Sequence, residues 1–222
     1  MKLKKYIIKL IMVFILLTFS GCKPKENSFE DIEKLLLSQI DWKADDFLSS
    51  LEEKPEDLIS IKEIYYGNFI DEDEEDLLVL FHVSHADIGG RDHYITAVYN
   101  KDTLGIKTQI SILQDHVSIY ILPYENGKDY ILAVSNTVYQ GVPAYSAELY
   151  QIQNNEWVLL PVSDYNPNGN YIYAVTDNSL LHIVEISYGE HMEISYSYMS
   201  TLYWDSYSGK FTDITDSGYP YR

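Results

Sequence analysis

The sequence predicts a mainly β protein, built as an antiparallel meander and preceded by a short helical segment. Twenty of the 21 tyrosines follow residue 21, among many isoleucines, valines and threonines, and these residue types favour strands. From residue 59 onward, short apolar or alternating runs are separated by turn residues such as Asn126-Gly127 and Asn168-Gly169. Before residue 55 the apolar residues recur at helical spacing instead.

The first 22 residues have the pattern of a secretion signal. Positive charge comes first, from Lys2, Lys4, Lys5 and Lys9. An apolar stretch over residues 10–19 follows, and Ser20-Gly21-Cys22 supplies small residues at a cleavage point. Because a bilayer-spanning helix needs roughly 20 apolar residues, this stretch is too short to span. We therefore expect residues 1–21 to be a signal peptide.

The end of this segment resembles the signal peptides of bacterial lipoproteins, in which a lipid is joined to a cysteine thiol. Ser20, Gly21 and Cys22 fit that pattern, while Phe19 stands where the family prefers leucine. The resemblance implies lipidation of Cys22 with fatty acyl chains such as palmitate. It also implies a location on the cell membrane or in the cell envelope, facing outside the cytoplasm. The alternatives are an ordinary secretory signal and an uncleaved N-terminal anchor.

Charge and cysteine content exclude several classes of partner. Four of the 16 basic residues and none of the 34 acidic ones precede Cys22, so the rest of the chain carries a net charge of −22. Phosphate backbones and anionic lipid heads repel such a polyanion, so we expect no nucleic-acid partner and membrane attachment through the lipid alone. Cys22 is the only cysteine, which excludes an internal disulfide.

After the signal we expect a tether over residues 22–27, a helical segment over residues 28–54 packed on the β domain, and one β domain over residues 55–222. Ser28 and Asp31 form an imperfect capping box for the first helix. Its apolar face contains Phe29, Ile32, Leu36 and Ile40. A second helix is predicted over residues 44–53, ending before Pro55. The helices could recruit a partner, but packing on the sheet is the favoured interpretation.

About eleven strands are predicted. The clearest cover residues 77–83, 94–99, 108–113, 117–122, 130–134, 147–152, 157–162, 171–175, 180–186 and 192–198. A weak repeat, with spacings of 53 and 41 residues, opens with Asp76-Leu77-Leu78-Val79, Asp129-Tyr130-Ile131-Leu132 and Asn170-Tyr171-Ile172-Tyr173. Such spacing is typical of propeller blades, so a β-propeller-like or partial propeller fold is expected. The alternative is a chance similarity among strands.

Six consecutive acids, residues 71–76, form the densest chemical feature. The stretch from Gly67 to Val79 resembles the calcium-binding FG-GAP or VCBS repeats, with matches at Gly67, Phe69, Asp76, Leu77, Leu78 and Val79. The resemblance implies a calcium ion held by the oxygen atoms of Asn68, Glu72 and Asp76. Ile70 offers no oxygen where the family has an asparagine ligand, and Glu72 replaces an aspartate, so the loop is a degenerate version. The alternative is a solvated acidic hairpin that discourages edge-to-edge association.

A group of histidines and a group of aromatic residues are two further candidates for binding. His82, His85, Asp87 and His93 are close enough in sequence for a zinc site, but His82 and His85 point to opposite faces of a continuous strand, so structural histidines are favoured. The aromatic residues Tyr196, Tyr198 and Trp204 could form a platform for a sugar or peptide, but core and cross-strand packing explains them without a ligand and is the favoured interpretation.

No nucleophile elbow and no phosphate-binding loop occurs in the sequence, so no catalytic residue is predicted. We expect a non-enzymatic binding or scaffolding module at the membrane surface, with an envelope protein or a glycan as its partner. The alternatives are a glycan-active envelope hydrolase that uses a carboxylate pair, and an accessory or immunity-type lipoprotein.

Overall fold

The computed structural model describes residues 29–45, 48–50, 58–84, 93–112, 114–139, 142–162, 171–176, 179–188 and 194–215. The predicted signal peptide and tether, Cys22 included, lie outside these ranges. The described residues form twelve strands, one α-helix and two short 3-10 helices. The prediction of a mainly β fold with a short N-terminal helical segment is confirmed.

The strands form three four-stranded antiparallel sheets, each a meander of consecutive strands. The first sheet contains β1 (Ile59–Gly67), β2 (Asp76–Val83), β3 (His93–Asn100) and β4 (Ile106–Ile112). The second contains β5 (His116–Leu122), β6 (Tyr130–Tyr139), β7 (Val142–Gln153) and β8 (Glu156–Leu160). The third contains β9 (Tyr171–Thr176), β10 (Leu180–Tyr188), β11 (Ile194–Asp205) and β12 (Lys210–Asp213).

The helical segment differs from its prediction in one part. The first helix is present as α2 (Phe29–Ser38), but the described residues of the predicted second helix lie in and between the 3-10 helices Trp42–Ala44 and Leu48–Ser50. Aspartates hold these turns: the Lys43 N–H donates to Asp41 at 3.2 Å, and the Leu48 N–H donates to Asp45 at 2.9 Å. Aspartate side chains that bond to nearby backbone groups favour such turns over a continuous helix.

The sheets also correct the predicted repeat. Asp76 opens β2 and Asp129 immediately precedes β6, and these are the second strands of their sheets. Tyr171 opens β9, which is the first strand of the third sheet. The second strand there is β10, which begins at Leu180. The third predicted unit therefore begins with the first strand of its sheet, whereas the other two begin with the second. The Asn-Tyr-Ile sequence resembles the Asp-Tyr-Ile sequence before β6, but the two precede different strands of their sheets.

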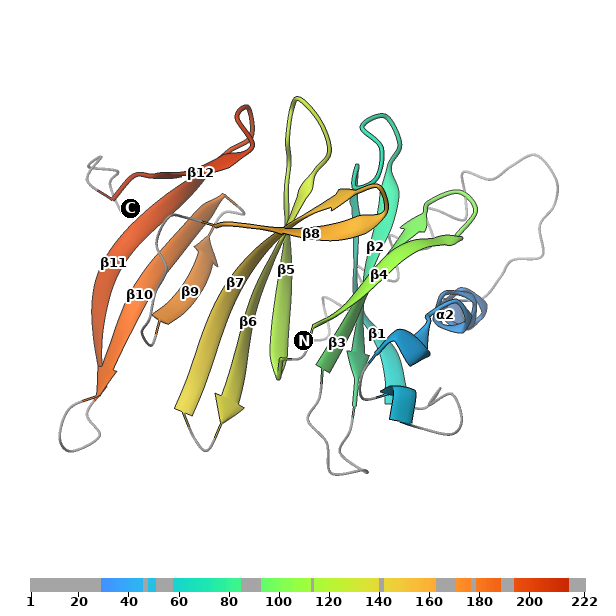
Figure 1. The fold of residues 1–222 in the computed structure, drawn as a ribbon, viewed down its shortest axis with the longest axis horizontal. Helices are drawn as coiled ribbons and strands as arrows, with labels where there is room; N and C mark the ends of the chain where they lie inside the picture. Colours follow the sequence, from blue (N-terminus) through green and yellow to red (C-terminus); the bar gives the residue numbers. More distant parts are fainter. Residues whose placement is uncertain are drawn as a thin grey trace.

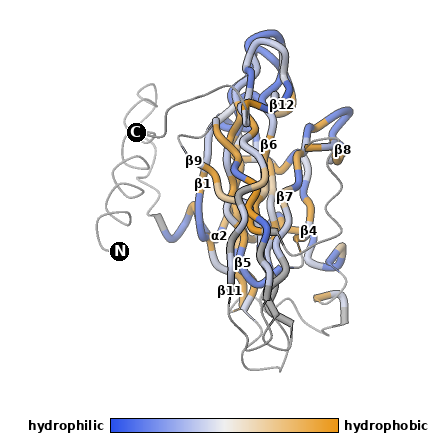
Figure 2. The backbone as a smooth tube through the Cα atoms, turned by 90° about the vertical axis from the view of Figure 1, so that its left-hand side faces the viewer, coloured by the Kyte–Doolittle hydropathy of each residue, from blue (hydrophilic) through white to orange (hydrophobic). Residues whose placement is uncertain are grey.

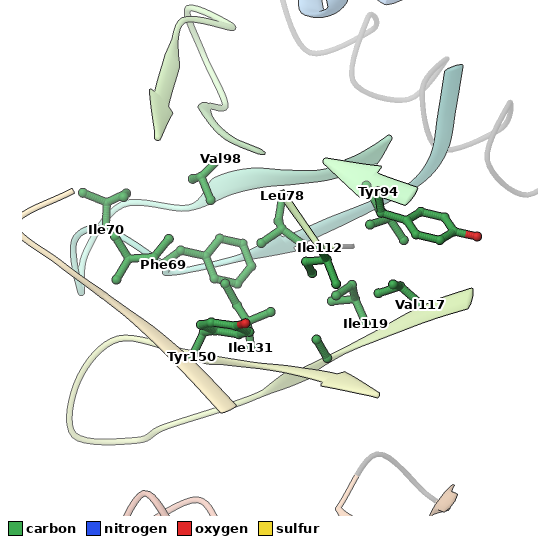
Figure 3. Close-up of a cluster of buried hydrophobic side chains, with 13 residues drawn as sticks. Phe69, Ile70, Leu78, Tyr94, Val98, Ile112, Val117, Ile119, Ile131 and Tyr150 are labelled. Carbon is green, nitrogen blue, oxygen red and sulfur yellow. The ribbon is translucent and has the colours of Figure 1, made fainter. Parts of the chain in front are cut away.

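The helical segment and the three sheets are stacked in the order of the sequence (Figure 1). Leu36, Ile40 and Leu48 pack on one face of the first sheet, against side chains that include Val79 and Phe81. The other face of that sheet packs on the second sheet (Figure 3), where the buried side chains include Phe69, Leu78, Leu80, Ile119, Ile131 and Ile152. The second and third sheets share further cores containing Leu122, Leu132, Leu149, Leu181, Leu202 and Trp204.

The two ends of this stack differ. The helical segment covers the outer face of the first sheet, whereas no element of the described ranges covers the outer face of the third (Figure 1). On that outer face the two ring nitrogens of His182 lie 2.9 Å from the hydroxyls of Thr176 and Thr201. Partial burial lowers the pKa of His182. The outer face of the third sheet is thus a hydrogen-bonded, largely polar surface at this position.

Side chains of β1 protect β5, the edge strand of the second sheet among the described strands. Lys62 donates to the Val117 carbonyl of β5 at 2.7 Å, and the Ile119 N–H of the same strand hydrogen-bonds to the Tyr65 hydroxyl. The Tyr65 hydroxyl in turn donates to Glu63. Burial is the main cause that raises the pKa of Tyr65 well above its usual range. These bonds occupy backbone groups that an edge strand would otherwise offer to another chain.

Candidate functional site at the loop end

Three connecting loops meet at one end of the stack, which we name the loop end. They are residues 68–75 between β1 and β2, residues 123–129 between β5 and β6, and residues 206–209 between β11 and β12. All three lie at the top of Figure 1, and each comes from a different sheet. The loop end therefore joins parts of the chain that are far apart in sequence.

Asp129 links the first two loops. Its carboxylate accepts the Asn68 N–H at 2.9 Å, and its own N–H donates to the Asn68 carbonyl at 2.8 Å. Gly67 makes this approach possible, because a Cβ at that position would lie 2.8 Å from the Asp129 carboxylate and 2.7 Å from the ring of Phe69. The glycine that matches the repeat family is thus required here by close packing.

Tyr124 links the second and third loops. A Cβ on Gly127 would lie 2.9 Å from the Tyr124 ring, and one on Gly209 would lie 3.0 Å from it. Gly209 also has a φ of +64°, which suits glycine. Across the same junction Asn126 donates to the Tyr207 carbonyl at 2.8 Å, and the Glu125 N–H donates to the Ser206 carbonyl at 2.9 Å. The three loops are thus packed and hydrogen-bonded into one unit.

Asp76 and Asp129 play the same local role in the two hairpins. One oxygen of Asp76 accepts the Ile70 N–H at 3.2 Å, and one oxygen of Asp129 accepts the Tyr124 N–H at 3.3 Å. Each aspartate thereby closes the loop that precedes the second strand of its sheet. Sequence reasoning noticed both as openings of a repeat but assigned a role only to Asp76.

The acids of the first loop are paired with lysines of the β3–β4 hairpin. Lys107 lies 2.8 Å from Asp76 and 3.1 Å from Glu74, and Lys101 pairs with Glu75. Burial raises the pKa of Asp76 despite the opposing effect of Lys107. Burial alone would lower the pKa of Lys107, but its hydrogen bonds to Asp76 and Glu74 raise it overall. The ammonium group of Lys107 thus keeps its charge between two carboxylates.

Of the three side chains predicted to bind calcium, Asp76 has other partners in this structure. Asp76 is 0% exposed and its oxygens contact the Ile70 N–H and the Lys107 ammonium, a cation that would repel calcium. The side-chain amide of Asn68 donates to the Glu72 carbonyl. Ile70 is buried in the core between the first two sheets. In the described part of the chain, no group of three or more His, Cys, Asp or Glu side chains is placed to hold a metal ion.

The predicted aromatic platform is not formed by Trp204. Its side chain is 2% exposed, its indole N–H donates to the Pro123 carbonyl at 2.8 Å, and its ring packs on Tyr130 and Phe211. Trp204 is therefore a core residue that supports the loop end. Tyr196 and Tyr198 lie in β11, but their side chains are outside the described part of the structure. The aromatic side chain exposed at the loop end is that of Tyr207, at 69%.

The described histidines of the predicted cluster, His82 and His93, contact different residues. Nε2 of His93 lies 2.7 Å from the Asp45 carboxylate, and both side chains are buried. His82 contacts the ring of Tyr94 instead. His85 and Asp87 lie outside the described residues. His93 therefore ties the helical segment to β3, a partner that its position in the sequence did not indicate.

Exposed acidic charge remains at the loop end after these pairs are formed. Asp71, Glu72, Asp73 and Glu125 are exposed, and no basic residue in the described ranges forms an ion pair with them. Figure 2 shows strongly hydrophilic backbone at the upper end of the molecule. The loop end is thus a fixed, acidic surface with one prominent tyrosine.

Comparisons with protein-family models, with curated proteins and with solved structures gave no match for this chain. The fold and the loop end therefore define the class: a mainly β protein of three stacked four-stranded antiparallel sheets with a helical segment on one end. No helix among the described residues is both long and apolar enough to cross a membrane.

Proposed function

We propose that this chain is a lipid-anchored, non-enzymatic binding or scaffolding module of the bacterial cell envelope. Its anchor would be a lipid on Cys22, and its body would face outside the cytoplasm. The partner would be a basic segment of an envelope protein that docks on the loop end. No role for nucleic acid is proposed, since a body of net charge −22 repels phosphates.

The observation that carries this proposal is the assembly of the loop end from all three sheets. Hydrogen bonds from Asp129 and Asn126 fix the three loops relative to one another. A pre-ordered surface loses little conformational entropy on binding, and its acidic charge speeds encounter with a basic partner. The buried carboxylate of Asp76 meanwhile pairs with the partly buried ammonium of Lys107. The arrangement thus favours binding over catalysis.

We also propose that the first two sheets are related as neighbouring blades of a partial propeller. β1 lies beside β5 through Lys62 and Tyr65, β4 lies near β8, and Asp76 and Asp129 occupy equivalent positions. The third sheet departs from this relation because β9 lies against β7. A regular propeller would place the first strands β5 and β9 side by side.

Co-purification from the envelope tests the function. Three full-length proteins are compared: the wild type, Cys22→Ser, and a loop variant carrying Asp71→Asn, Glu72→Gln and Asp73→Asn. We expect Cys22→Ser to leave the membrane fraction, and the loop variant to stay in that fraction while losing a cross-linked partner protein. A matched control, Glu30→Gln with Asp102→Asn and Glu156→Gln, removes the same charge from exposed sites elsewhere and should keep the partner.

The outcomes separate the parts of the proposal. Membrane association of Cys22→Ser equal to that of the wild type would refute lipidation. Equal cross-linking by the loop variant and the wild type would refute docking at the acidic loop, and equal loss in the control would assign the effect to net charge. Retention of the wild type on purified cell-wall glycan, with no cross-linked protein, would replace the protein partner by a glycan.

A further inference from the structure

A partly buried cation from β4 lies beside the acidic residues 71–76. The Lys107 ammonium lies 2.8 Å from Asp76 and 3.1 Å from Glu74, in a place where the lysine side chain is 18% exposed and the aspartate is fully buried. The second oxygen of Glu74 accepts a hydrogen bond from the Asn100 side chain. One positive group thus joins both carboxylates to the β3–β4 hairpin.

Lys101 provides an internal comparison on the same hairpin. It pairs with Glu75 at the surface, where its side chain is 38% exposed and that of the glutamate is 47% exposed. Water and salt screen such a pair, so it contributes little to stability. The two lysines therefore differ in burial while sharing their partner loop, and only Lys107 reaches the buried Asp76.

We infer that the Lys107 ammonium takes the structural place of the calcium ion in the repeat that this loop resembles, and that the loop of this protein is ordered without calcium. Two observations support this replacement of calcium by lysine. Asp76 is held by the Lys107 ammonium and the Ile70 N–H, and the Ile70 side chain fills the core where the family pattern has an asparagine ligand. The inference does not depend on the proposed binding function.

A calcium titration of the wild type is the first test. The full chain, purified in a mild detergent, is heated in 1 mM calcium chloride and in 1 mM EGTA while its unfolding is followed by circular dichroism. We expect the same midpoint temperature Tm within about 1 °C, because a ligand that binds only the folded state would raise it. A reproducible rise with calcium, together with heat on calorimetric titration, would overturn the inference.

Substitution of the lysine is the second test. Lys107→Met keeps most of the side-chain volume but leaves Asp76 buried without its counter-charge, and we expect Tm to fall by roughly 5–10 °C. The matched control Lys101→Met should change it by no more than about 2 °C. Equal effects of the two substitutions would contradict the role given to Lys107.

A double substitution separates the loss of the ion pair from a general failure of the variant to fold. Asp76→Asn combined with Lys107→Met removes both charges and keeps an oxygen that can accept the Ile70 N–H. We expect this variant to be more stable than Lys107→Met alone, since the unpaired buried charge is gone. A double variant no more stable than the single one would show that the ion pair is not the cause. If Lys107→Met does not fold, the recovery of folding in the double variant decides the question.

Discussion

Two buried aspartates of the described residues, Asp45 and Asp76, each pair with a basic side chain. Asp45 accepts hydrogen bonds from the Leu48 N–H and the Ser111 hydroxyl and pairs with His93, all close to the junction between the helical segment and the first sheet. Burial works to raise the pKa of Asp45, but these hydrogen bonds outweigh it and lower the pKa from 3.8 to about 2. The charged form of Asp45 is therefore the form that fits the fold.

This pairing predicts a pH dependence of stability. Because the pKa of Asp45 is lower in the folded state, its contribution is complete above its ordinary pKa and is lost as the pH falls towards 2. A shift of this size corresponds to about 2 kcal/mol. The free energy of unfolding of the wild type and of Asp45→Asn is measured by urea denaturation at pH 6 and at pH 2. We expect the difference between the two proteins to be about 2 kcal/mol larger at pH 6, in favour of the wild type.

An exposed position serves as the control for this measurement. Asp102 is exposed on the surface turn after β3, at the opposite end of that strand from His93, and Asp102→Asn is the control substitution. A difference between wild type and Asp45→Asn that stays constant from pH 6 to pH 2 would contradict the stabilising role of the Asp45 charge.

At the level of elements, the sequence predicted strands better than their relation to one another. Alternation and turn residues identified ten strands that the structure contains, and β1 and β12 complete the sheets. The position of a strand within its sheet depends on which neighbours it pairs with, and the local sequence does not show this. The sequence from Asn170 therefore predicted the second strand of a sheet, whereas β9 is the first strand of the third sheet. The short turns at Asp41 and Asp45 likewise depend on side-chain bonds that a hydrophobic pattern does not show.

The candidate site likewise depends on contacts between distant parts of the chain, which the sequence alone does not show. The acidic run and Gly67 were visible in the sequence, and the repeat marked Asp129. Lys107 was not visible, because it lies 33 residues from Glu74 and reaches it only through the pairing of β2, β3 and β4. Trp204 was interpreted as a possible exposed ring, and only the packing of the third sheet on the second shows it to be buried.

The helix α2 offers a test of how the helical segment is attached. Leu36 is 1% exposed and packs on the first sheet, whereas its neighbour Leu35 is 43% exposed. We expect Leu36→Ala to lower the free energy of unfolding by about 3 kcal/mol and Leu35→Ala by less than about 0.5 kcal/mol, measured by urea denaturation. Equal small effects would mean that α2 does not stabilise the β domain.

For the whole molecule, the order of the stack predicts an orientation at the membrane. Phe29 is the seventh residue after Cys22, so a lipid on Cys22 would hold the start of α2 within about 25 Å of the membrane. Layers of secondary structure lie about 10 Å apart, which places the third sheet roughly 30 Å farther along the stack than α2. On the proposed lipidation, the uncovered face of the third sheet is the end far from the membrane.

Energy transfer to a membrane dye measures this orientation. Lys34→Cys on α2 and Lys210→Cys on β12 are both exposed positions, and acylation of Cys22 leaves the introduced cysteine as the only thiol to label. In neutral lipid vesicles we expect stronger transfer from the label at position 34 than from that at position 210. Equal transfer would refute the orientation, whereas no transfer from either label would refute the anchor.

The Asp45–His93 pair has a consequence for a protein held at one end. A pull on the anchor would act on the N-terminal side of α2 and reach the sheets through the helical segment. The pair joins that segment to β3, a central strand of the first sheet, so a pull would reach this central strand as well as the edge strand β1, into which the chain leads. The pull would thus be shared between two strands of the first sheet.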